Sequence, residues 1–175
     1  MPELLLVRHA EPDWKGALLG RRDCGLSEQG RDAAAKAIPP IRAAAAYISP
    51  LRRARETASL LDPSILRTTV EELAEIGLGQ WEGKTWPEVE DQWPELARRK
   101  MQDWFGVPAP GGETWDQALE RARAALARIR QGPFPAVAVA HLGINAALAY
   151  LITGHDPKQH VQQYCEILTY VLSID

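Results

Sequence analysis

The chain has few cysteines and no long hydrophobic run. Its 175 residues include two cysteines, Cys24 and Cys165, whose spacing matches no metal-binding motif, and a chain of this length needs no disulfide framework. The apolar run at residues 4–7 is too short for a signal-peptide core, and no run is long enough to cross a bilayer. We therefore expect a cytoplasmic protein with reduced thiols and no membrane partner.

An excess of charge of one sign is also missing. The formal net charge is −3, and acidic residues balance the arginine pairs along the chain. The sequence has no basic stripe of the kind that binds nucleic acid. A negatively charged substrate must therefore be held by a few local cations. With 46% hydrophobic residues the chain can bury one core, and we expect a single domain over residues 1–175. Whether it forms a homodimer is left open.

Apolar runs alternate with helical patterns along the chain. Strands are expected at residues 4–7, 45–49, 66–70, 136–140 and 167–174. Helices are expected after Ser27, ending early at Pro39-Pro40, and then over residues 51–61, from the capping box of Thr114 and Gln117, and over 142–152. Unbroken apolar strands are typical of parallel sheets covered on both faces. The pattern predicts an α/β fold, a three-layer α/β/α sandwich with a mostly parallel central sheet.

Histidines and arginines lie at the predicted carboxyl ends of strands, where such folds bind ligands. His9 follows the first strand and His141 follows the fourth. Arg8 adjoins His9, and Arg53 lies in the first turn of the helix expected at 51–61. Guanidinium groups bind phosphate oxygens in pairs and keep their charge, so the four side chains together indicate a phosphate site. A single histidine at a strand end would more simply be structural.

A series of short blocks runs in order along most of the chain. The blocks are LVRHAE at 6–11, GRRDCGLSEQG at 20–30, SPLRRARETA at 49–58, the stretch from Glu75 to GQWEG at 79–83, PGGET at 110–114 and AHLG at 140–143. In this order and spacing they resemble the motifs of the histidine phosphatase superfamily, the phosphoglycerate-mutase-like proteins. They look most like those of short bacterial phosphatases such as α-ribazole phosphatases.

The resemblance implies catalytic roles for particular residues. His9 would be the nucleophile that takes the phosphoryl group, with its other ring nitrogen held by a nearby backbone carbonyl. Arg8, Arg53 and a protonated His141 would surround the transferring group, so that no metal and no other cofactor is needed. Glu75 would donate a proton to the leaving group and later accept one from water.

Other positions are expected to shape substrate binding. Arg8, Arg53 and His141 would bind the phosphate, joined by the backbone N–H of Leu142 at a helix amino end. Arg21, before Ser27, is assigned to the leaving group. The sequence departs from the family pattern at Ala10, Lys15, Leu19, Leu142 and Asn145.

Most of the six tryptophans fall between residues 81 and 115. This stretch largely coincides with residues 76–112, which cover the site in the family and are expected to form a lid-like segment. The tryptophans could stack on a ring-bearing leaving group or pack a small helical lid. We expect packing for most of them, with one or two lining the pocket.

Three functions remain at this stage. The favoured one is hydrolysis of a small phosphorylated metabolite, a phosphate monoester, through a phosphohistidine. A phosphoglycerate-type mutase would use the same intermediate, but the chain has little room for the insertions that enclose the substrate in such enzymes. A catalytically silent phospho-ligand-binding module is disfavoured because the five catalytic positions are all retained.

Overall fold

The computed structural model describes residues 2–173, which contain a five-stranded sheet. The strands are β1 (Glu3–Arg8), β2 (Ala45–Ile48), β3 (Leu66–Thr69), β4 (Ala136–Ala140) and β5 (Ile167–Val171). Their order is β3-β2-β4-β1-β5, with β5 antiparallel to β1 and the other pairs parallel. The mostly parallel sheet predicted from the sequence is confirmed.

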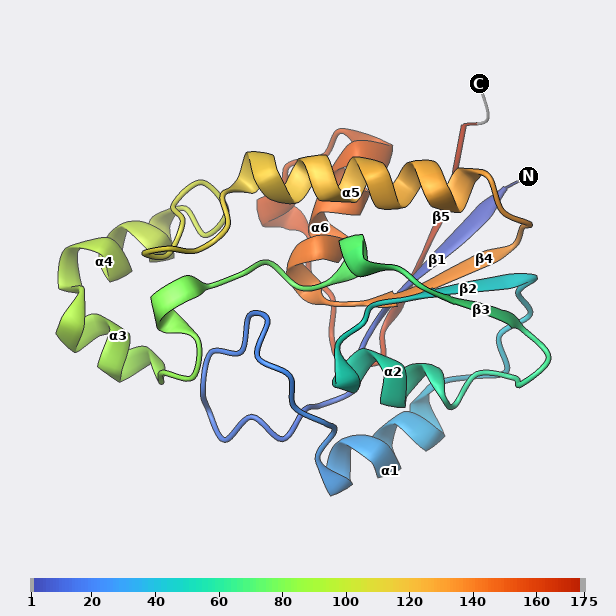
Figure 1. The fold of residues 1–175 in the computed structure, drawn as a ribbon, viewed down its shortest axis with the longest axis horizontal. Coiled ribbons are helices and arrows are strands. Elements are labelled where there is room, and N and C mark those ends of the chain that lie inside the picture. The colour runs from blue at the N-terminus through green and yellow to red at the C-terminus, as the bar shows by residue number, and fades with distance from the viewer. Residues whose placement is uncertain (1, 174–175) are drawn as a thin grey trace.

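Helices cover both faces of this sheet. Helices α1 (Glu28–Ala37) and α2 (Arg52–Ala58) lie on one side, and α5 (Trp115–Arg130) and α6 (Leu142–Thr153) on the other (Figure 1). Short 3-10 turns are found at η1 (Glu71–Leu73), η2 (Gly79–Trp81) and η3 (Pro157–Gln159). The architecture is the predicted α/β/α sandwich. No helix within residues 2–173 combines the length and the apolar character needed to span a membrane.

The central strand β4 shows why its sequence is apolar throughout. All its residues are buried, and they alternate between the two sides of the sheet. Ala136, Ala138 and Ala140 join the cluster under α5 and α6, whereas Val137 and Val139 join the cluster over α2. A strand covered on both faces has no polar side, so the period-two pattern of a half-exposed strand is absent.

Most element boundaries match the sequence-based expectations. Helix α1 is capped by Ser27 and ends at Ala37, before Pro39-Pro40, and the capping box of Thr114 and Gln117 opens α5. Helix α2 is shorter than the predicted 51–61. The last strand ends at Val171 rather than continuing through 173, and position 174 of the prediction lies outside the described residues.

Segment 76–112 lies at one end of the sheet and has an apolar cluster of its own. It contains α3 (Trp86–Gln92) and α4 (Pro94–Gln102), which extend beyond the sheet (Figure 1). Its cluster is built on Trp81, which is fully buried and makes edge contact with Trp86 at a centroid distance of 5.9 Å. The two ends of the segment meet where Gly79, at φ +50°, approaches the backbone of Pro110 too closely for a side chain.

Replacing Trp81 with alanine tests the importance of this cluster. Removing a fully buried indole leaves a cavity, so Trp81→Ala should lower the free energy of unfolding by about 3–5 kcal/mol. Urea denaturation followed by circular dichroism measures this change. Trp14→Ala is the matched control, because Trp14 is 37% exposed and should cost much less. Equal losses in the two variants would contradict the assignment of Trp81 as the centre of the cluster.

Candidate active site

The site forms where the carboxyl ends of three parallel strands meet. Arg8 ends β1 and His9 follows it, while His141 follows β4 and is the N-cap of α6. Ser49 follows β2 and leads into α2, which carries Arg53. The rings of His9 and His141 have centroids 4.9 Å apart. The fold thus brings together side chains that are up to 133 positions apart (141 − 8 = 133).

The ring of His9 is fixed in one tautomer by two hydrogen bonds. Its Nδ1 lies 2.6 Å from the carbonyl oxygen of Ala10, which can only accept, so Nδ1 carries the proton. The Nε of Arg53 lies 3.3 Å from His9 Nε2 and can only donate, so Nε2 offers its lone pair. The carbonyl contact expected for the nucleophile is present at Ala10.

The environment of His9 keeps the imidazole uncharged. Burial, followed by the positive charges of Arg53 and Arg8, lowers the pKa of His9 from 6.5 to about 3, although the bond to Ala10 opposes this shift. The ring therefore stays neutral at physiological pH. A neutral ring with an unprotonated Nε2 is the form that can attack an electrophile.

The two arginines beside His9 are held by backbone carbonyl groups rather than by carboxylates. Arg53 is buried and donates from Nη1 to Arg22 O and from Nη2 to Gly20 O, each at 2.7 Å. Arg8 donates from Nη1 to Gln162 O at 2.7 Å, and its guanidinium carbon lies 4.1 Å from the ring centroid of Tyr164. Their charges are therefore not neutralised by acidic partners and can attract an anion.

His141 is completely buried, and its surroundings disfavour a positive charge. Its Nε2 lies 2.7 Å from Ser49 Oγ. Burial and the nearby groups His9, Arg53 and Arg8 hold the pKa of His141 well below its usual range. The expectation of a protonated His141 concerns the site with a phosphoryl group bound, and it stays a prediction. Within residues 2–173, the Nδ1 of His141 and the Nε of Arg8 are buried and have no hydrogen-bond partner.

Glu75 reaches the site from the chain after η1. Its Oε1 accepts from the N–H groups of Ile76 at 2.8 Å and Ile144 at 3.1 Å, and its Oε2 accepts from Gly143 at 3.2 Å. Gly143 and Ile144 belong to the first turn of α6, whose N–H groups have no acceptor within the helix and are free to bind the carboxyl oxygens. The carboxyl group therefore lies at the amino end of the helix that His141 caps.

A cavity of about 640 Å³ lies beside these side chains, and His141, which is completely buried, is not among its lining residues. Arg8, His9, Arg53 and Glu75 line it together with Leu19 and Leu142, and residues from segment 76–112 form part of its wall. Of the tryptophans between 81 and 115, Trp104 and Trp115 line the cavity, whereas Trp81, Trp86 and Trp93 pack in the cluster of the segment. Trp14 also lines it. Within residues 2–173, no group of three or more His, Cys, Asp or Glu side chains is placed to hold a metal ion.

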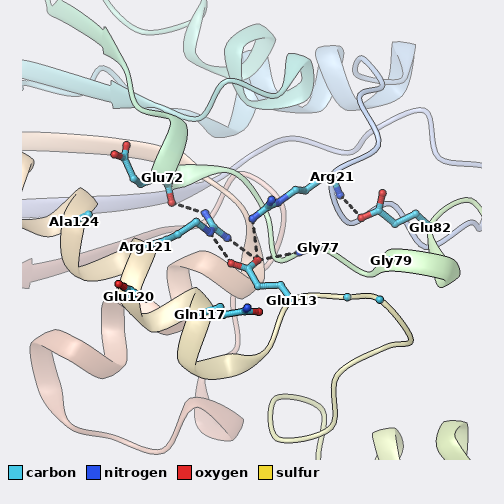
Figure 2. Close-up of a pocket in the computed structure, with 12 residues that line it drawn as sticks. Arg21, Glu72, Gly77, Gly79, Glu82, Glu113, Gln117, Glu120, Arg121 and Ala124 are labelled. Carbon is cyan, nitrogen blue, oxygen red and sulfur yellow. Dashed lines mark hydrogen bonds and ion pairs between the residues drawn. The ribbon is translucent and has the colours of Figure 1, made fainter.

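Arg21 lines a second cavity, of about 790 Å³, and is not among the residues that line the cavity of His9 (Figure 2). Its Nη2 donates to Glu113 Oε2 and its Nε donates to the carbonyl of Glu75, both at 3.1 Å. Its guanidinium is thus directed towards Glu113, and the assignment of Arg21 to the leaving group stays a prediction.

The structure shows the conformation, exposure or contacts of the positions that depart from the family pattern. Ala10 is buried and does not have a positive φ, so its β-carbon is tolerated. Lys15 has a φ of 51° and is exposed. Asn145 is buried and donates to Gln162 Oε1 at 2.9 Å, while Gln162 donates to Leu6 O at 2.8 Å. Asn145 thereby supports the loop whose carbonyl group holds Arg8.

Several residues of the site escaped sequence reasoning. Ser49 contacts His141, Gln162 and Tyr164 contact Arg8, and Thr57 accepts from Ala10 N at 2.9 Å. Ser49 and Thr57 lie inside the block at 49–58, and the position of Ser49 after a strand was a usable signal. No local pattern marks Gln162 or Tyr164, since their partner lies more than 150 positions away.

Comparison with known proteins agrees with this geometry. The site combines two histidines and two arginines at the strand ends of an α/β sandwich. The chain belongs to the histidine phosphatase superfamily (branch 1), whose family model matches residues 4–171.

Curated relatives include both phosphatases and mutases. Phosphoserine phosphatase 1 of Hydrogenobacter thermophilus is 30% identical over 97% of this chain and 85% of its own length. A 2,3-bisphosphoglycerate-dependent phosphoglycerate mutase of Parvibaculum lavamentivorans is 33% identical over 69% of this chain and 64% of its own length. A bifunctional protein of Mycobacterium tuberculosis is 38% identical over 74% of this chain, but the match spans only 37% of that relative.

Solved structures of this superfamily have the same fold. A mycobacterial glucosyl-3-phosphoglycerate phosphatase superposes with a TM-score of 0.82 at 26% identity, covering 96% of this chain and 89% of that one. A putative α-ribazole-5′-P phosphatase from Escherichia coli gives a TM-score of 0.77 at 22% identity, covering 90% and 82%. The second likeness shows the fold alone.

The lowered pKa of His9 predicts how stability changes with pH. The unfolded chain binds a proton on this residue near pH 6.5, whereas the folded chain binds it only near pH 3, so acid favours unfolding between these values. One such group contributes a slope of about 1.4 kcal/mol per pH unit. His9→Asn should therefore make the fall in stability between about pH 6 and pH 4.5 shallower.

Urea denaturation at a series of pH values measures this slope. His155→Asn is the matched control, because His155 is exposed and lies outside the site, and its slope should equal that of the parent protein. An unchanged slope in His9→Asn would contradict the burial of a neutral ring.

Proposed function

We propose that the chain hydrolyses a small phosphate monoester through a phosphohistidine formed on Nε2 of His9. The observation that carries this proposal is the fixed tautomer of His9, whose Nδ1 proton is held by Ala10 O while Nε2 retains its lone pair. A buried neutral nucleophile bordered by unneutralised cations is suited to attack a negatively charged phosphorus centre.

The reaction proceeds in two displacements. In the first, the Nε2 lone pair of His9 forms a bond to phosphorus, the bond from phosphorus to the leaving oxygen breaks, and Glu75 donates a proton to that oxygen. In the second, a water oxygen bonds to phosphorus, the nitrogen–phosphorus bond breaks, and the Glu75 carboxylate takes a proton from the water. The enzyme returns to its starting protonation state.

Arg8, Arg53 and His141 bind the transferring group. The unpartnered Nε of Arg8 and Nδ1 of His141 are donors, or can become donors, that phosphate oxygens would satisfy. An arriving dianion also compensates the charge that a protonated His141 would carry, so substrate binding favours the cationic form. Leu142, at the start of α6, adds its backbone N–H. These groups supply the positive charge that a metal ion provides in other phosphoryl-transfer enzymes.

Hydrolysis is preferred over a mutase reaction. A relative named as a phosphatase matches 97% of this chain and one named as a mutase matches 91%, so coverage does not separate the two reactions. The preference rests on the sequence, which leaves little room for the insertions that enclose the substrate in mutases. The mutase remains the alternative, because both reactions share the phosphohistidine and differ in what accepts the group. On the leaving-group side the cavity presents Trp14, Met101, Trp104 and Phe105, which favour a leaving group with apolar surface.

Substitution of His9 tests the intermediate. With a phosphate monoester, His9→Asn should lower kcat by about 10³-fold or more, since the nucleophile is lost. Rapid acid-free quenching with ³²P-labelled substrate should trap one labelled histidine in the parent protein, and peptide mapping should place it at position 9. Isomerisation of 3-phosphoglycerate is measured in parallel. Label on another residue would overturn the proposal, and isomerisation faster than phosphate release would favour the mutase.

Chelation tests whether the cations are sufficient. Phosphate release should be unchanged after dialysis against EDTA, because Arg8, Arg53 and His141 stabilise the transferring charge. A metal-dependent phosphatase treated in the same way is the positive control. Loss of turnover that added Mg²⁺ or Zn²⁺ restores would show that a metal takes part.

A further inference from the structure

The backbone that carries Glu75 has no regular secondary structure of its own. Residues 74–77 lie between η1 and η2, so no neighbouring strand or helix backbone donates to their carbonyl groups. Arg121 of α5 supplies the missing donors. Its Nη1 donates to Glu72 O at 2.6 Å and to Ala74 O at 3.0 Å, and its Nη2 reaches Glu75 O at 3.5 Å.

Glu113 holds Arg121 in this orientation. The guanidinium Nε donates to Glu113 Oε1 at 2.6 Å and Nη2 donates to Oε2 at 2.9 Å, a bidentate pair. The Glu113 side chain is only 9% exposed. Burial alone would raise its pKa, but the hydrogen bonds and charge of Arg121 hold the pKa of Glu113 below its usual value. The pair is therefore ionised and rigid.

Glu113 also binds the chain directly after Glu75. Its N–H donates to Gly77 O at 2.9 Å, and its Oε2 accepts from Gly77 N at 3.1 Å. Arg21 adds its bonds to Glu113 Oε2 and to Glu75 O. Figure 2 shows both arginines converging on Glu113 from opposite sides. The backbone before and after Glu75 is thus anchored to one buried ion pair.

These contacts are made to the backbone around Glu75 and not to the side chains of His9, Arg8 or Arg53, although Glu113 also lines the cavity of His9. Arg121 does not line the cavity of His9, whereas the carboxyl group of Glu75 does. Proton transfer requires donor and acceptor at hydrogen-bond distance, so a small shift of this backbone would separate the carboxyl group from the leaving oxygen. A lysine at 121 could not make the same set of contacts, because it lacks the planar fork of donors.

We infer that Arg121 and Glu113 are positioning residues that set Glu75 for proton transfer to the leaving group. Neither touches the reacting atoms, and both act through the backbone at 72–77. The inference rests on the proposed function, in which Glu75 is the proton donor.

The test compares two leaving groups. p-Nitrophenolate departs without needing a proton, whereas an alkoxide such as that of glycerol 2-phosphate needs one. Arg121→Met and Glu113→Gln should each lower kcat for the alkyl phosphate at least about tenfold more than kcat for p-nitrophenyl phosphate. KM should change little for either substrate, because Arg8, Arg53 and His141 are untouched. An equal loss on both substrates would show only general damage to the fold and would overturn the inference.

A double-mutant cycle links the effect to Glu75. Glu75→Gln alone should lower kcat for the alkyl phosphate by about 10²-fold or more, with a much smaller loss for p-nitrophenyl phosphate. Adding Arg121→Met to Glu75→Gln should then cause little further loss, because the group it positions no longer donates a proton. Additive losses would refute positioning through Glu75.

Two controls separate the outcomes. Glu120→Gln alters an exposed residue of the cavity that Arg21, Glu113 and Arg121 line, and Glu120 makes no hydrogen bond to Glu75. This variant should leave the ratio of kcat for the alkyl phosphate to kcat for p-nitrophenyl phosphate unchanged. Circular dichroism and the thermal midpoint show whether each variant is folded. If Arg121→Met is unfolded, the test relies on Glu113→Gln, which keeps the shape of the side chain, and on Arg121→Lys, which keeps its charge. If Glu75→Gln itself shows no leaving-group dependence, the proposed role of Glu75 fails. If Glu75→Gln shows this leaving-group dependence and the Arg121 and Glu113 variants do not, only the positioning inference fails.

Discussion

The chemistry of this protein depends on how one imidazole ring is oriented. A carbonyl oxygen can only accept and a guanidinium can only donate, so the contacts of His9 with Ala10 and Arg53 leave a single arrangement of its proton. Ala10 is held in turn by Thr57, which also donates to the backbone of Arg53. The ring of His9 and the guanidinium of Arg53 are thereby fixed by one set of bonds between the chain after β1 and α2. A small rotation of the ring would remove the lone pair from the cavity.

The surrounding charge arrangement follows from the sheet. Parallel strands place their carboxyl ends at one edge, and this edge gathers Arg8, His9 and His141 with Arg53 of the adjoining helix. Backbone carbonyls rather than carboxylates hold both arginines, so the site keeps a net positive character within a chain of net charge −3. Burial and these cations hold the pKa of both histidines below its usual value, so that the positive charge of the site resides on the two arginines.

The ion pair nearest to these groups is found at the backbone of Glu75. Glu113 and Arg121 pair beside this backbone, where they stabilise an irregular segment. The apolar cluster around Trp81 does the same for segment 76–112, which contributes part of the cavity wall. Both features hold backbone that borders the cavity of His9.

The sequence by itself determined the α/β/α sandwich and the strand ends. It also identified the candidate site residues His9, Arg8, Arg53, Glu75 and His141, because periodicity and short motifs are local properties. Only the tertiary structure decided the direction of Arg21, the contacts of Arg8 with Gln162 and Tyr164, and the pairing of Arg121 with Glu113. It also decided that the pKa of His141 lies below its usual value, since a pKa depends on burial and on neighbours that packing supplies. Partners separated by about 150 positions produce no local sequence pattern, and they come into contact only when the strands have assembled into the sheet.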